Sequence, residues 1–260
     1  MKDPDDSHPR RPGRLIDWPR SKLRQINEGV RQDLSGVWHV LGYVRHLLRG
    51  NRIRRSSLFE SIDDLHPPVL LIHGYLGTRG ALYVLEHRLK ADGISVFSFN
   101  LGTLNVRDIR GSAFLIHRKV ETILAQTSVK KIDIIGHSMG GLIGLYYVKK
   151  LGGHEKVRKL IMLGTPIKGT WAALLGVFTP AVVSASAWQL LPGSRFLGEL
   201  ESGELPEGVQ YFTIAAQRDR LCPQESASVD GAEALTVPLG HTSLVIGAEA
   251  YRHILWALRK

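Results

Sequence analysis

The sequence predicts a three-layer α/β domain in which a mostly parallel sheet carries helices on both faces. From about residue 67 onward, short apolar runs alternate with segments of helical length and periodicity. This alternation is typical of a parallel sheet with crossover helices. The chain has 260 residues, of which 43% are hydrophobic. It is therefore long enough for one domain with a sizeable core and an appendage.

The individual elements follow from the same alternation. Strands are expected at 69–72, 94–99, 131–135, 157–163, 209–215 and 234–237, and helices at 81–91, 108–126, 139–151 and 248–258. The stretch 169–204 breaks the pattern, because it is apolar, rich in small residues and interrupted by Gly176, Pro180 and Pro192. We expect a helical cap there, inserted into a domain that spans 67–260.

The first 60 residues have a different character. Residues 1–20 are polar and rich in Pro and Arg, and we expect a poorly ordered tail. Residues 21–60 are expected to form a helical extension, because apolar residues recur at steps of three and four. These residues are Val30, Leu34, Val37, Leu41, Val44 and Leu48, and Trp38, Val40, Tyr43 and Leu47 widen the same face.

Most of the formal net charge of +10 lies in this N-terminal part. Between Arg10 and Arg55, twelve Lys and Arg face three acidic residues, which is a net +9. Two interpretations of the helix stay open. It docks on the domain with a solvated basic rim, which we favour slightly, or residues 30–55 lie on an anionic membrane surface. The rest of the chain is near neutral, which argues against a nucleic-acid-binding surface.

Several classes of protein are disfavoured. No run of 18 apolar residues predicts a transmembrane helix, and the acidic start at Met1–Asp6 lacks the apolar stretch of a secretory signal. We therefore expect a cytoplasmic protein. Cys222 is the only cysteine, so no internal disulfide forms, and we interpret it as a small buried hydrophobe. No metal-ligand spacing or Gly-rich phosphate loop is present, so neither a metal nor another cofactor is expected.

The strongest motif is the pentapeptide Gly136-His137-Ser138-Met139-Gly140, which has the pattern G-x-S-x-G. A serine nucleophile must be exposed and must lie near a base that takes its proton. A sharp turn from strand to helix supplies that exposure, and the small residues around the serine allow strand and helix to pack closely. Here a predicted strand precedes the motif and a predicted helix follows it. The alternative is a tight Gly-rich turn with an incidental serine.

On these residues the chain resembles the lipases and esterases of the α/β-hydrolase family, in particular bacterial triacylglycerol-lipase-like members. In that family one strand ends in His-Gly, as at 73–74, and a later strand ends in Gly-His-Ser-Met-Gly-Gly, as at 136–141. The segments 164–169 and 191–197 also resemble family segments. The likeness covers about Pro67 to Lys260. It implies a serine nucleophile, then an acid, then a histidine in chain order.

The residues expected in those two later roles follow the last two predicted strands. Asp219 is the only carboxylate near the end of strand 209–215, with Asp230 as the second choice. His241 follows strand 234–237, and His154 is a weaker rival on another loop. In this chemistry the histidine accepts the proton of Ser138, and the carboxylate fixes the tautomer of the histidine.

Acyl transfer also requires hydrogen-bond donors for the developing oxyanion. The backbone N–H of Met139 is one candidate, and the second is expected from Tyr75, with Leu76 in reserve. His73 and His137 flank these loops. We interpret both histidines as hydrogen-bonded scaffolding residues that do not take part in catalysis.

The apolar cap indicates the substrate class. Trp171, Leu174, Phe178 and Trp188 are the expected substrate contacts, and such a lid favours a small-molecule apolar or lipidic ester. The predicted function is therefore a serine esterase or lipase that acts through an acyl-enzyme on Ser138. An acyltransferase or thioesterase with the same three residues remains an alternative, and so does a non-catalytic module that binds a membrane or a partner.

Overall fold

The computed structural model describes residues 38–48, 63, 65–102, 105–173 and 184–260. The chain divides into two compact units, residues 1–35 and 36–260. All described residues belong to the second unit, so the helical segment at 38–48 groups with the α/β domain and not with the N-terminal tail. In this part of the chain no helix is long and apolar enough to cross a membrane.

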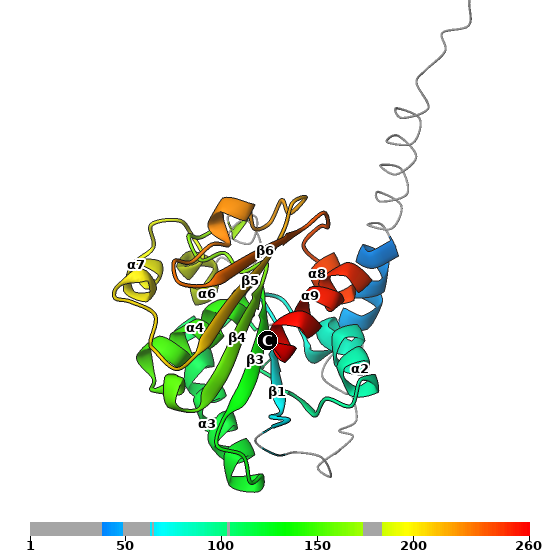
Figure 1. Ribbon diagram of the computed structural model, residues 1–260. Coiled ribbons are helices and arrows are strands. Elements are labelled where there is room, and N and C mark those ends of the chain that lie inside the picture. Colours follow the sequence, from blue (N-terminus) through cyan, green and yellow to red (C-terminus); the bar gives the residue numbers. More distant parts are fainter. Residues whose placement is uncertain (1–37, 49–62, 64, 103–104, 174–183) are drawn as a thin grey trace, which may run out of the picture. The chain divides into compact units, whose positions relative to one another are not determined.

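One parallel sheet organises the described residues (Figure 1). Its six strands lie in the order β2-β1-β3-β4-β5-β6, and every neighbouring pair is parallel. The strands are β1 (Val69–Ile72), β2 (Val96–Ser98), β3 (Ile132–His137), β4 (Val157–Leu163), β5 (Gln210–Ala216) and β6 (Glu233–Val237). The predicted fold class is confirmed. Because the strands are parallel, the loops after β1, β3, β5 and β6 all leave from one edge of the sheet.

Helices cover both faces of this sheet. They are α2 (Tyr83–Ala91), α3 (Ile109–Gln126), α4 (Met139–Lys150), α6 (Ala185–Gln189), α7 (Arg195–Glu201), α8 (Ser243–Ile246) and α9 (Ala248–Arg259). Short 3₁₀ turns stand at η1 (Arg79–Leu82), η2 (Gly153–Glu155) and η4 (Gln224–Ser226). One core cluster packs α3, α4 and α7 against the sheet, and a second packs α2, α8 and α9 against its other face.

Local sequence explains where these helices begin. The side chain of Asp108 accepts a hydrogen bond from the backbone N–H of Arg110 at the start of α3. Ser184 and Ser194 cap α6 and α7 in the same way. Along α3 the buried residues recur at helical spacing, at Ile109, Ala113, Ile116, Val120 and Ile123, so one face of this long helix enters the core. Of the predicted cap at 169–204, the described part contains α6 and α7.

The helical residues 38–47 are docked on the face of the domain that carries α2 and α8. His39 Nδ1 lies 2.9 Å from the hydroxyl oxygen of Ser243, and Thr78 donates a hydrogen bond of 3.0 Å to the carbonyl of Leu47. The ring of His46 stacks on Tyr83 with 4.9 Å between centroids. The favoured interpretation of a docked helix therefore agrees with the described residues. The rest of the expected 21–60 extension lies outside the described residues.

Candidate active site

Ser138 occupies a strained turn between β3 and α4. Its backbone has φ 55° and ψ −128°, a conformation that a non-glycine residue adopts at a cost. The turn is held on one side by the Ser138 N–H, which donates to the carbonyl of Leu163 at 2.8 Å. On the other side the carbonyl of Ser138 accepts from the N–H of Gly141 at 3.0 Å. The serine is thus fixed at the edge of the sheet where the strands end, as the G-x-S-x-G motif predicts.

The glycines of the motif allow the close approach of strand and helix. A Cβ at Gly136 would lie 2.5 Å from the backbone of Gly140. A Cβ at Gly140 would lie 2.2 Å from the carbonyl oxygen of Ile72, in the neighbouring strand β1. Gly74 faces the serine directly, because its Cβ would come within 2.8 Å of the Cβ of Ser138. Larger residues at these positions would push the turn away from the sheet.

Gly140→Ala is therefore expected to lower the free energy of unfolding by more than about 3 kcal/mol, because two backbone segments would have to separate. The matched control is Gly111→Ala in α3, where an added Cβ meets nothing within 4 Å. The control should raise stability by roughly 0.5–1 kcal/mol. Urea unfolding followed by circular dichroism measures both. Equal stability of the two variants would contradict the packing described for the turn.

Asp219 and His241 form a hydrogen-bonded pair next to this turn, in which the Asp219 side chain is fully buried and His241 is partly buried. His241 Nδ1 lies 2.6 Å from Asp219 Oδ2. The other carboxylate oxygen of Asp219 accepts two backbone hydrogen bonds, from Leu221 N–H at 2.9 Å and from Cys222 N–H at 2.8 Å. Both carboxylate oxygens of Asp219 therefore take part in hydrogen bonds, which fixes the orientation of the side chain. Because Nδ1 of His241 faces a carboxylate, it carries the proton, and Nε2 is left free to accept one.

The loop after β1 approaches the same place. The backbone N–H groups of Tyr75 and Met139 have no hydrogen-bond acceptor among the described residues. Leu76, the reserve candidate, has φ 52°, and Gly77 N–H closes the turn on the carbonyl of Gly74 at 3.1 Å. Two free donors that flank a serine, one on a loop and one at the first residue of a helix, are what an oxyanion hole requires.

Asn105 fixes this loop, and sequence reasoning missed it. Its side-chain amide donates to the carbonyls of His73 and Gly74, at 3.1 and 3.3 Å, and its Oδ1 accepts from Ser112 at 3.4 Å. The residue is fully buried and has φ 46°, a left-handed conformation that asparagine tolerates better than most residues. The only signal in the sequence is an asparagine in a short polar loop, which by itself indicates no partner.

His73 and His137 are buried and neutral. Burial lowers the pKa of His73 to about 4 and that of His137 to about 3, with further lowering for His137 from the neighbouring His241. His137 Nε2 donates to the backbone carbonyl of His241 at 3.3 Å, and the two rings lie 4.7 Å apart. A neutral His137 places no positive charge beside His241. These contacts fit the scaffolding role predicted for both histidines.

Ser138 and His241 open into one cavity of about 360 Å³. Its wall is mostly apolar and comes from distant parts of the chain: Tyr43, Leu47, Gly74, Tyr75, Leu76, His137, Pro166, Thr170, Ala172, Ala173, Leu190, Leu221 and Thr242. The helix at 38–47 thus forms part of the wall through Tyr43 and Leu47. The Tyr43 ring meets His137 edge to face, with 6.3 Å between centroids. The contribution of this helix to the cavity wall was not predicted from the sequence.

The expected contacts from the cap are only partly described. Trp171 and Trp188 are both more than half exposed and are not among the described residues that line the cavity, so their role as substrate contacts stays a prediction. The chain around Trp171 turns Thr170, Ala172 and Ala173 toward the cavity, which leaves the indole outside. Leu174 and Phe178 lie outside the described residues.

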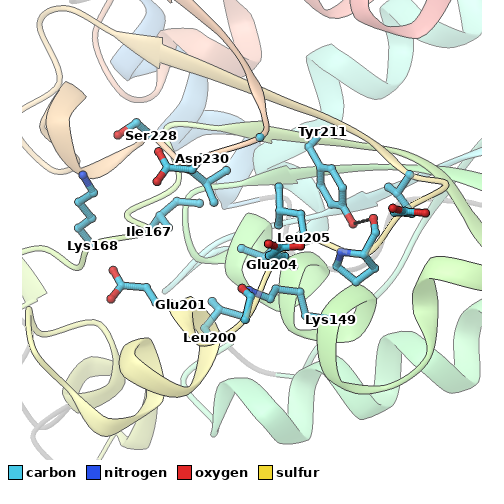
Figure 2. A pocket seen from close by; sticks show the side chains of 17 residues that line it. Lys149, Ile167, Lys168, Leu200, Glu201, Glu204, Leu205, Tyr211, Ser228 and Asp230 are labelled. Atoms are coloured by element: carbon cyan, nitrogen blue, oxygen red, sulfur yellow. Dashed lines mark hydrogen bonds between the residues drawn. The ribbon is translucent and has the colours of Figure 1, made fainter.

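The second choices for the acid and the base lie elsewhere. His154 belongs to η2, before β4, and so stands at the opposite edge of the sheet from Ser138. Asp230 lines a separate cavity of about 860 Å³ that shares no residue with the first. Figure 2 shows this second cavity, with Asp230, Lys168 and Glu201 on its wall. No group of three or more His, Cys, Asp or Glu in the described part of the chain has an arrangement that could hold a metal ion.

Comparison with known proteins agrees with this geometry. The sequence model of the family described as alpha/beta hydrolase fold matches residues 67–189. This chain has the alpha/beta hydrolase fold. The resemblance seen in the sequence is confirmed. The match includes the His-Gly loop after β1, the serine turn and β4.

Relatives of this chain include proteins named triacylglycerol lipase. Those of Pseudarthrobacter phenanthrenivorans and Burkholderia plantarii are each 31% identical to it over 112 residues, which are 40% of this chain. The matched segment covers 34% and 30% of these two relatives, so the likeness spans about a third of their length. A triacylglycerol lipase of Vibrio cholerae is 35% identical over 79 residues, 28% of this chain and 25% of its own.

Solved structures share the fold over a larger part of the chain. The mature form of a Bacillus licheniformis lipase superimposes with a TM-score of 0.64 at 16% identity and covers 78% of this chain and 96% of its own. A monoacylglycerol lipase of Paleococcus ferrophilus superimposes with a TM-score of 0.54 at 16% identity. The superposition covers 74% of this chain and 95% of the lipase.

Proposed function

We propose that this protein is a serine carboxylester hydrolase of the lipase type, with Ser138 as nucleophile, His241 as base and Asp219 as the orienting acid. The observation that carries the proposal is the Asp219–His241 hydrogen bond of 2.6 Å at a cavity that also contains Ser138. The conformation of the serine turn supports it as well, because the strain exposes a side chain that no structural role requires.

The reaction follows from these groups. His241 Nε2 accepts the proton of Ser138 Oγ as that oxygen attacks the ester carbonyl, and Asp219 stabilises the imidazolium that forms. The N–H groups of Tyr75 and Met139 bind the oxyanion. His241 then protonates the leaving alcohol. A water molecule attacks the acyl-enzyme in the second half, with His241 again as base. Transfer to another alcohol, or attack on a thioester, would use the same groups.

An apolar acyl group fits the cavity. Leu47, Leu76, Leu190 and Leu221 belong to its hydrophobic wall, and burial of each methylene of a substrate against such a wall contributes about 0.8 kcal/mol. The names of the relatives, triacylglycerol lipase, point to the same class of substrate. We therefore propose a lipidic or otherwise apolar ester as the substrate.

The experiment that tests this proposal is the hydrolysis of p-nitrophenyl esters of increasing chain length. Two additional methylenes, from acetate to butyrate, are expected to raise kcat/KM about tenfold. Hydrolysis by free imidazole, which has no cavity, is the control and should show no such rise. Product analysis with added glycerol separates hydrolysis from acyl transfer. A folded protein that cleaves no ester in the series would refute the proposal.

A further inference from the structure

The docked helix presents an apolar surface to the solvent. We define the outer stripe as the exposed residues Trp38, Val40, Leu41, Val44 and Leu48. Trp38 is 71% exposed, Leu41 55% and Leu48 81%. The sequence predicted one apolar face that contains Leu41, Val44 and Leu48 and is widened by Tyr43 and Leu47. In the structure Tyr43 and Leu47 pack on the domain together with His39 and His46, and the remaining part of that face points outward.

The outer stripe is continuous with the wall of the serine cavity. At 100° per residue, Val40 and Val44 follow Tyr43 and Leu47 around the helix, and Leu48 and Leu41 come next. One apolar arc therefore runs from the cavity to the outer side of the helix. Leu76 and Leu221 line the cavity and are also more than 40% exposed, so they mark its opening. The opening and the outer stripe belong to one apolar region.

The charge of the neighbouring sequence indicates what this region contacts. Arg45 is exposed on the same helix, and the segment Arg10–Arg55 carries a net +9. A second copy of the chain would bring two such segments together, and like charges repel. An anionic lipid surface attracts basic residues and accepts apolar side chains below them, and tryptophan is common at this interface.

We infer that the outer stripe binds the surface of an anionic lipid membrane and brings the opening of the serine cavity to that surface. This inference deepens the proposed function, because a lipidic ester would then reach Ser138 without leaving the lipid phase. The helix at 38–48 would thus serve two purposes: its inner side completes the cavity, and its outer side holds the protein on the membrane.

Flotation of the full-length protein with lipid vesicles tests the inference. Ser138→Ala protein is used throughout, so that binding is measured without hydrolysis. It is expected to float with vesicles of phosphatidylcholine and phosphatidylglycerol and much less with phosphatidylcholine alone. Leu41→Glu with Leu48→Glu should weaken binding at least about tenfold, because two apolar anchors are lost. Trp38→Ala, which adds no charge, should also weaken vesicle binding. This variant keeps the test decisive if the variant with two glutamates does not fold.

The matched control is Phe114→Glu. Phe114 is 55% exposed, like Leu41, but lies on α3, which covers the other face of the sheet. Its replacement should leave vesicle binding unchanged. Equal binding by the Leu41/Leu48 variant and the parent, or equal binding to neutral and anionic vesicles, would overturn the inference. A dimer that light scattering detects, and that the Leu41/Leu48 variant dissociates, would also overturn the inference. Vesicle binding by the Ser138→Ala protein, together with no esterase activity in the wild-type protein, would refute the proposed function alone.

Discussion

Ser138→Ala is expected to lower kcat/KM for soluble esters about 10⁶-fold, because the nucleophile of the proposed acyl-enzyme is lost. No side-chain hydrogen bond of Ser138 to another described residue holds the turn, which is fixed by backbone groups instead. The variant should therefore fold with unchanged stability. Rates with p-nitrophenyl butyrate and thermal unfolding measure the two effects.

An exposed serine provides the control for this substitution. Ser128 lies in the turn after α3, away from the cavity, and Ser128→Ala should keep the full rate. If Ser138→Ala retained more than a small fraction of the activity, water or another residue would be the nucleophile and the proposed role of the turn would be wrong.

Asp219→Asn is expected to lower kcat about 10⁴-fold while the fold is retained. The amide oxygen of the new side chain can accept the two backbone hydrogen bonds from Leu221 and Cys222, which the carboxylate accepts now. This orientation turns the NH₂ group toward His241 Nδ1, which must then accept a hydrogen bond. The proton of the imidazole moves to Nε2, the atom that has to receive the proton of Ser138.

The matched control here is Asp230→Asn. Asp230 was the second choice for the acid in the sequence, and it lies on the wall of the separate cavity shown in Figure 2. Its replacement should leave kcat within about a factor of two, as expected for a surface change away from the site. Comparable losses in both variants would mean that Asp219 acts only through general electrostatics or stability.

Much of the fold was predictable because local signals agree with each other. The strands at Val69–Ile72 and Val157–Leu163 were predicted with the observed bounds, since each is a short, mostly apolar segment that is followed by turn residues. The serine turn was predictable because its glycines are required by steric contact. Asp219 and His241 were placed by their position after the last two strands, and the structure brings them within hydrogen-bonding distance.

Other features depend on contacts between distant parts of the chain and leave no local pattern. Asn105 reaches the loop after β1 across more than thirty residues of sequence. Tyr43 and Leu47 line the cavity because the helix docks with its histidines and tyrosine inward. Hydrophobic periodicity predicted an apolar face of this helix correctly but not which arc of that face packs on the domain. Periodicity measures amphipathicity and carries no information about the partner.

The central claim is that Ser138 is an activated nucleophile, and reaction with a fluorophosphonate tests it most directly. Ser138 Oγ would form a bond to phosphorus, fluoride would leave, and His241 would take up the proton of the hydroxyl. Peptide mass spectrometry of the folded wild-type protein should locate a single adduct at Ser138, and Ser138→Ala should give none. Absence of an adduct in the folded wild-type protein, or an adduct at a different serine, would contradict the account.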